Sequence, residues 1–142
     1  MKGKNKVYAV IDTNVVVSSF FSRNGQSNPA LIIEKIFDNI IVPIYNDEIL
    51  AEYKEVLSRP VFPFSPERIN DVIATFKEFG ISAERTPVSD ETFPDPDDIV
   101  FYEIKMSVED SYLVTGNLKH FPQKPFVVTP ARMIEILEEK NI

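Results

Sequence analysis

The chain has 142 residues, 44% hydrophobic and 26% charged, and this length and composition suit a single globular domain over residues 1–142. The absence of cysteine excludes disulfide bonds, Cys-ligated metal sites and a thiol nucleophile, and a single histidine excludes His-rich metal sites. The net charge of −7 argues against broad nucleic-acid binding but leaves open a local carboxylate cluster that holds a metal ion. No apolar run approaches the roughly 20 residues that cross a bilayer, so we expect no membrane contact and a cytoplasmic protein.

Strand and helix patterns alternate along the first half of the chain. An apolar, β-rich run is typical of a buried strand, and Asp12, Thr13 and Asn14 follow it with turn and helix-capping side chains. The predicted elements are a strand at 7–11, an amphipathic helix with Pro29 in its first turn, a strand at 40–44, and a helix from Asn46 or Asp47 to about Arg59.

The alternation continues in the second half. The predicted elements are a helix at 67–79 that Gly80 ends, a short strand within 81–88, an acidic, proline-rich loop at 90–98, a helix at 99–108, strands at 112–115 and 126–128, and a helix from Pro130 to about Lys140. This order predicts an α/β domain whose mostly parallel sheet, of about five strands, is covered on both faces. Ligand sites in such sheets lie beyond the carboxyl ends of the strands.

Several polar side chains fall at that edge of the predicted sheet. Asp12 directly follows the first strand, Asp97 and Asp98 open a helix, and Asn117 follows a later strand. Carboxylates gathered there would repel one another unless a cation lay between them. Oxygen ligands suit a hard ion such as Mg²⁺ or Mn²⁺. Asp110, in contrast, precedes its strand and is expected at the opposite edge.

Helix geometry selects one acid on the helix that follows residues 40–44. Successive residues of a helix are rotated by about 100° around its axis. With Ile49 set at zero, the apolar stripe of this helix is centred at about 40°. Glu52 lies near about −60°, at the edge of this stripe, whereas Glu48 lies further round, near about −100°. A half-buried glutamate needs a partner, so Glu52 is the first candidate to point into a site and Glu48 the second.

Four motifs occur in a characteristic order along the chain. They are Val10-Ile11-Asp12-Thr13-Asn14-Val15, Leu50-Ala51-Glu52-Tyr53, Asp95-Pro96-Asp97-Asp98 and Tyr112-Leu113-Val114-Thr115-Gly116-Asn117. With them the chain resembles a PIN domain from about Val7 to Glu138, in particular the toxins of bacterial toxin–antitoxin systems. The resemblance implies a three-layer α/β/α sandwich, a Mg²⁺- or Mn²⁺-dependent endoribonuclease acting on RNA, a cognate antitoxin protein and a homodimer.

The resemblance also assigns roles to individual residues. The first and second acids of the family correspond to Asp12 and Glu52. The third corresponds to Asp98, with Asp97 open because the alignment can slip by one residue. These acids would hold one or two ions, and a metal-activated water would attack the phosphodiester, so no protein nucleophile is required.

The fourth position departs from the family pattern. The family's fourth acid usually ends a Thr-x-Asp motif, but this chain has Thr115 and then Asn117. An amide oxygen can bind Mg²⁺ but brings no charge, whereas the Thr115 hydroxyl would position a water or a ligand. A PIN fold that serves as a binding or assembly module, with weak or no catalysis, therefore stays open as the alternative.

Two other folds gather acids on a parallel sheet. A receiver-like phosphoacceptor domain expects paired acids after the first strand and a lysine after the last, but this chain has a single Asp12 and then Thr129-Pro130. A haloacid-dehalogenase-like phosphatase expects a second aspartate at position 14, which is Asn14.

His120 is predicted to be a surface or loop residue. Residues that could guide RNA by charge are Arg23, Arg59, Lys119 and Lys124.

Overall fold

The computed structural model describes residues 6–88 and 91–142. Within these residues, five parallel strands form a sheet in the order β3-β2-β1-β4-β5. The strands are β1 (Val7–Ile11), β2 (Ile41–Tyr45), β3 (Ile81–Ser82), β4 (Ser111–Val114) and β5 (Val127–Val128). The helices are α1 (Thr13–Phe20), α2 (Asn28–Phe37), α3 (Asp47–Leu57), α4 (Pro66–Phe79), α5 (Ile99–Met106) and α6 (Pro130–Glu139), with 3₁₀ turns η2 (Pro96–Asp98) and η3 (Leu118–His120).

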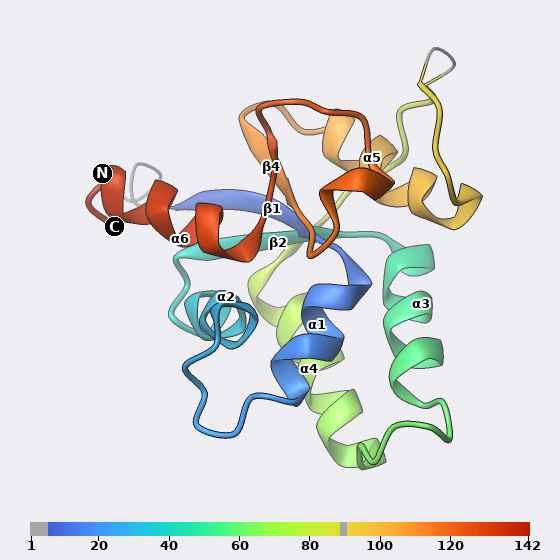
Figure 1. Cartoon of the computed structure of the whole chain (residues 1–142), viewed down its shortest axis with the longest axis vertical. Coiled ribbons are helices and arrows are strands. Elements are labelled where there is room, and N and C mark those ends of the chain that lie inside the picture. Colours follow the sequence, from blue (N-terminus) through green and yellow to red (C-terminus); the bar gives the residue numbers. More distant parts are fainter. Residues whose placement is uncertain (1–5, 89–90) are drawn as a thin grey trace.

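Helices cover both faces of this sheet. Helices α2 and α4 pack on β2, α2 also contacts α1 and α6, and α3 packs beside α1 and α4. Helix α5 contacts β1, β2 and β4 from the other face, and Figure 1 shows it on the opposite side of the sheet from α1, α2 and α4. The predicted three-layer α/β/α sandwich is confirmed, and the sheet is entirely parallel.

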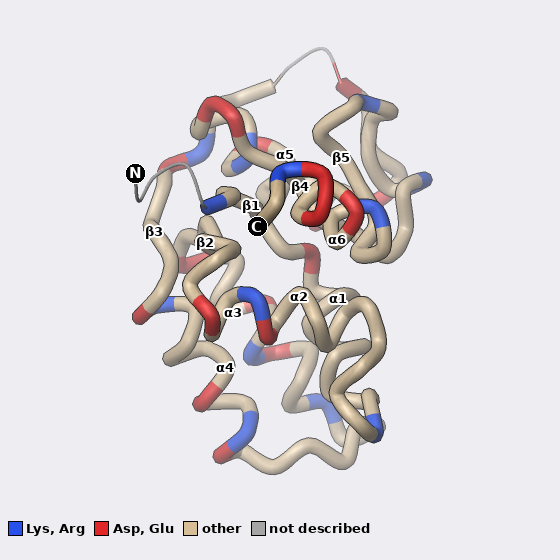
Figure 2. Tube along the Cα trace, turned by 90° about the vertical axis from the view of Figure 1, so that its left-hand side faces the viewer, with Lys and Arg blue, Asp and Glu red and all other residues tan. Residues whose placement is uncertain are grey.

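Sequence signals explain where the elements begin. None of the strands carries a charged residue, so the charged positions lie on helices and loops (Figure 2). Asn46, not Asp47, caps α3, because its side chain accepts a hydrogen bond from the backbone N–H of Ile49 at 2.9 Å. Proline occupies the first turn of α2, α4 and α6, where it removes no helical hydrogen bond.

The short strand predicted within residues 81–88 is confirmed as β3. It ends at Ser82, after which the chain turns from β2 toward α5: the Thr86 N–H donates to the Glu103 carbonyl at 3.2 Å. The Arg85 guanidinium binds the Glu103 carboxylate at 2.7 Å. These contacts with a distant helix draw the segment away from the sheet edge. The ends of the other predicted elements, among them β2, α5, β4 and β5, differ from the structure by about one or two residues.

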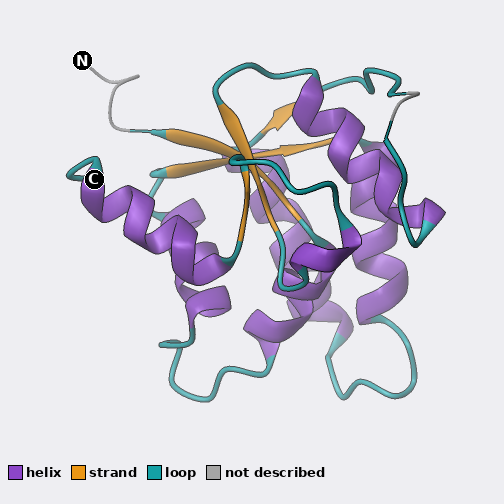
Figure 3. Ribbon diagram, turned by 45° about the horizontal axis from the view of Figure 1, so that its top comes forward, coloured by secondary structure: helices purple, strands orange, loops and turns teal. Residues whose placement is uncertain are grey.

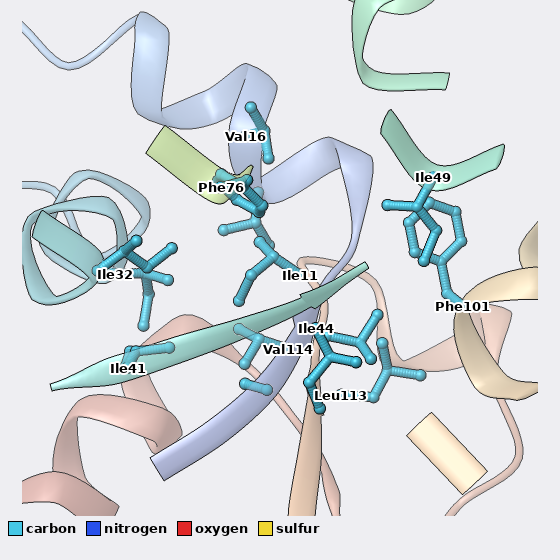
Figure 4. Close-up of a cluster of buried hydrophobic side chains, with 14 of the residues drawn as sticks. Ile11, Val16, Ile32, Ile41, Ile44, Ile49, Phe76, Phe101, Leu113 and Val114 are labelled. Carbon is cyan, nitrogen blue, oxygen red and sulfur yellow. The ribbon is translucent and has the colours of Figure 1, made fainter. Parts of the chain in front are cut away.

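The core lies between the sheet and its two helical layers, and the strands cross the middle of the molecule (Figure 3). Figure 4 shows Ile11 and Val114, the last residues of β1 and β4, among these buried side chains. Gly80 ends α4 where it passes β2, because a Cβ there would lie 2.3 Å from the Pro43 carbonyl oxygen. Among the described residues, no helix is long and apolar enough to span a membrane.

Candidate active site

Asp12 lies at the carboxyl end of the central strand. The register of β1 and β4 pairs Ile11 with Val114, so Asp12 and Thr115 follow side by side. Asp12 is 4% exposed, and both carboxylate oxygens accept hydrogen bonds. Its Oδ1 accepts from the Thr13 N–H at 2.8 Å and caps α1, and its Oδ2 accepts from the Thr115 hydroxyl at 2.8 Å. The carboxylate is therefore held by the first residue of α1 and by the residue that follows β4.

Helix α3 brings Glu52 to the same edge. The Thr13 hydroxyl donates to Glu52 Oε2 at 2.5 Å, and the next residue, Tyr53, donates its hydroxyl to the Ile11 carbonyl. These two adjacent contacts fix α3 against the end of β1. Glu48 instead is exposed and pairs with Arg85 at 2.9 Å. The structure thus places Glu52, and not Glu48, against the neighbour of Asp12.

The two adjacent aspartates of η2 point differently. Asp98 is 8% exposed, and among the described residues its Oδ2 has no hydrogen-bond partner. Asp97 is exposed and lines, with Glu48 and Glu52, a hollow of about 240 Å³. Asp98 is therefore directed into the site, while Asp97 lies at its rim. Asp110 precedes β4, at the edge of the sheet away from Asp12.

The chain after β4 folds back over this edge. The Asn117 N–H donates to the Thr115 hydroxyl oxygen at 3.0 Å. Its side-chain Oδ1 accepts from the Lys119 N–H at 3.2 Å and begins η3. The Asn14 side chain also binds this segment: its Oδ1 accepts a hydrogen bond from the Gly116 N–H at 2.9 Å. The amide oxygen of Asn117 is thus already engaged by the backbone.

His120 is the residue that sequence reasoning did not place in the site. As predicted, it lies at the surface, on the turn η3 with its side chain 41% exposed, and it also lies between Asn117 and Asp98. Its Nε2 is 2.9 Å from Asn117 Nδ2, and its Nδ1 is 3.4 Å from Asp98 Oδ2. Since the Asn117 amide nitrogen donates, Nε2 accepts, and Nδ1 carries the proton that faces Asp98. The available signal was Asn117 itself, a capping residue three positions before the histidine.

A model of the PIN domain matches residues 8–119 of the chain. The chain belongs to the PIN-domain family. Among curated proteins, none matches it. PIN domains are generally metal-dependent nucleases that typically use Mg²⁺ or Mn²⁺. The matched segment contains all the residues described above, from Asp12 to Asn117, and ends just before His120.

The acids of this PIN domain perturb one another. Burial, followed by the negative charge of Asp12, raises the pKa of Asp98 from its ordinary 3.8 to about 6. Burial also raises the pKa of Asp12 and of Glu52, although hydrogen bonds from Thr115 and Thr13, respectively, oppose the shift. All three carboxylates would therefore gain from a nearby cation.

The donor chemistry of these residues fits a hard divalent ion. Three carboxylates supply only oxygen ligands, and the buried Asp98 Oδ2 makes no hydrogen bond among the described residues, with the His120 ring nitrogen 3.4 Å away. Within residues 6–88 and 91–142, however, no three acidic, histidine or cysteine side chains lie close enough to form a ready-made metal site.

Proposed function

We propose that this PIN domain is an endoribonuclease that uses Mg²⁺ or Mn²⁺ held by Asp12, Glu52 and Asp98. The observation that supports the proposal is the position of Asp12 at the carboxyl end of β1, with Glu52 hydrogen-bonded to its neighbour Thr13 and with the charge of Asp12 acting on Asp98. The three acids come from three different elements, β1, α3 and the η2–α5 junction. A fold that brings separate acids together at a stability cost is typical of a functional site.

Each acid has a side chain that orients it. A divalent ion bound there would activate a water for attack on the phosphodiester and stabilise the developing charge. The Thr115 hydroxyl holds Asp12, and the Thr13 hydroxyl holds Glu52. The Nδ1 proton of His120 faces Asp98 and keeps that carboxylate turned into the site. Asp97 remains a rim ligand for a second ion.

The order of the four motifs supports a finer assignment. We place the protein among toxins of toxin–antitoxin systems, with RNA as substrate, a cognate antitoxin protein as inhibitor, and a homodimer as the working form. The entire chain, residues 1–142, forms one PIN-like domain in this proposal. Of the basic residues that could guide RNA, Arg59 pairs with Glu55 at 2.8 Å, whereas Lys119 lies beside the site, next to His120.

The test is cleavage of fluorogenic single-stranded and structured RNA by metal-stripped protein to which Mn²⁺ or Mg²⁺ is added. Asp12→Asn should lower the rate at least about 100-fold, because it removes the central ligand. Glu52→Gln should lose most activity, while Glu48→Gln is the matched control and should retain it. Undiminished cleavage by Asp12→Asn would refute the proposal, and a larger loss in Glu48→Gln than in Glu52→Gln would refute the assignment of the second acid.

One observation favours the second candidate, a PIN module that binds RNA or protein without efficient cleavage. Asn117 brings no charge, and both ends of its amide are engaged, by Lys119 and by His120. Three acids then act without a fourth. Wild-type protein that binds RNA with Mn²⁺ present, but leaves it intact over hours, would favour this function over the nuclease.

A further inference from the structure

A second site candidate lies at the amino-terminal edge of the sheet, away from the acids. A cavity of about 540 Å³ opens between the starts of β1 and β4, the approach to β5 and the end of α6. We call it the amino-edge cavity. In Figures 1 and 3 the start of β1 and the end of α6 lie on the same side of the molecule. Lysines from three elements line it: Lys6, Lys105 and Lys140.

Lys105 is the most unusual of these residues. It is only 8% exposed, and its ammonium lies 4.3 Å from the centre of the Phe126 ring. Among the described residues it makes no ion pair, and the nearest charge that acts on it is that of Asp110. Burial lowers its pKa, and the charge of Asp110 opposes the shift. Its ammonium is not among the buried polar atoms left without a hydrogen-bond partner in the described part of the chain, and the aromatic ring satisfies only one direction of its three donors.

The amino-edge cavity is lined mostly by positive charge, whereas the chain as a whole is negatively charged. The protein carries −7, yet three lysines line this cavity against one carboxylate, Asp110. Figure 2 colours these basic and acidic positions along the trace, including those near the start of β1 and the end of α6. Clustered positive charge in an otherwise acidic protein attracts anions to that one place.

The remaining walls select among anions. Tyr112 and Phe126 are partly exposed and, with Pro125, provide flat or apolar surface. Asp110 supplies an acceptor suited to hydroxyl or amino groups. A volume of about 540 Å³ exceeds what inorganic phosphate needs and lies within the range of small-molecule sites. These features match a phosphate joined to a sugar and an aromatic base.

We propose that the amino-edge cavity binds a nucleotide through its terminal phosphate. The lysines contact the phosphate, and Tyr112 and Phe126 contact the base. A free mononucleotide and the phosphorylated end of an RNA share this chemistry. Strand β1 separates Val7, which lines the cavity, from Asp12 by five residue steps, or about 17 Å at about 3.3 Å per residue. The cavity is therefore independent of the proposed cleavage site.

Calorimetric titration of metal-stripped, full-length protein tests this. Adenosine 5′-monophosphate should bind more tightly than inorganic phosphate, and adenosine should bind least. Lys105→Met keeps the length of the side chain but removes its charge, and it should weaken binding of the monophosphate at least about tenfold. Lys77→Met is the matched control, an exposed lysine on α4, and should stay within about twofold of wild type. Asp12→Asn should also bind normally, which separates this result from the nuclease test.

Two further arms complete the experiment. Should Lys105→Met fail to fold, Lys140→Met, at an exposed position, carries the same prediction. A 5′-phosphorylated tetranucleotide is compared with its 5′-hydroxyl form: tighter binding than the mononucleotide assigns the site to an RNA end, and weaker binding assigns it to free nucleotides. The proposal is overturned if adenosine binds as tightly as its monophosphate, if the lysine variants bind like wild type, or if Lys77→Met loses as much as they do.

Discussion

Asp98 is the residue at which the proposed function imposes the clearest stability cost. Its side chain is 8% exposed, one of its oxygens has no hydrogen-bond partner among the described residues, and its pKa is raised to about 6. Burial is the main cause, and the charge of Asp12 is the second. In the absence of metal, ionised Asp98 therefore destabilises the folded state. Replacing it with asparagine should stabilise the metal-free protein near neutral pH.

The size and sign of this effect follow from proton linkage. A rise from 3.8 to about 6 corresponds to at most about 3 kcal/mol at 1.36 kcal/mol per pKa unit. Because the pKa is higher in the folded state, the folded protein binds more protons between about pH 4 and pH 6. Its free energy of unfolding should therefore fall as the pH rises through this window. Asp98→Asn should be about 1–3 kcal/mol more stable than wild type at pH 7.5 and about equal at pH 3.5.

Urea unfolding of metal-stripped protein from pH 3.5 to pH 7.5 measures this difference. Asp71→Asn is the control, because Asp71 is an exposed aspartate on α4, away from the three acids. Equal m-values would show that the variants unfold to the same extent. Parallel pH profiles for wild type and Asp98→Asn, or a less stable variant at pH 7.5, would contradict the argument.

Three other substitutions test contacts in the candidate active site and in the fold. Thr115→Val removes the hydroxyl that donates to Asp12 and should cost about 1–3 kcal/mol in urea unfolding, with Thr115→Ser close to wild type. Gly80→Ala places a methyl group against the Pro43 carbonyl and should destabilise by about 1–3 kcal/mol in thermal unfolding; an unchanged midpoint would argue against this close approach. Asn117→Asp adds the missing charge and should tighten Mn²⁺ binding by about 1–2 kcal/mol in calorimetry, whereas equal affinity would place residue 117 away from the ion.

Local patterns predicted the features that depend on nearby residues. The apolar run before Asp12 gave β1, and the phase of α3 separated Glu52 from Glu48, because strand and helix periodicity fixes which way a side chain points. Asn46 capped α3 because a side-chain oxygen at that position satisfies an N–H that the helix leaves free.

Features that depend on distant partners were not predictable in this way. The sequence predicted a short strand within residues 81–88, but not that the chain would leave the sheet after Ser82, where Arg85 binds Glu103, eighteen positions later. The residues next to His120 in the sequence form no recognisable motif. His120 comes close to Asp98 only because the chain at η3 folds back over the edge of the sheet. The amino-edge cavity likewise assembles residues from widely separated elements, of which Lys105 is the deepest.

The repulsion among the acids links stability to metal binding in this PIN domain. Burial is the main cause that raises the pKa values of Asp12, Glu52 and Asp98, and the negative charge of Asp12 further raises those of Glu52 and Asp98. A cation at the site would relieve that repulsion. Metal binding would therefore recover the free energy by which the repulsion destabilises the metal-free fold, and this recovery would strengthen the metal affinity. The two quantities should therefore vary in opposite directions with pH. Above about pH 6, where Asp98 is ionised, the metal-free protein is at its least stable with respect to this group and its affinity for Mn²⁺ is at its highest.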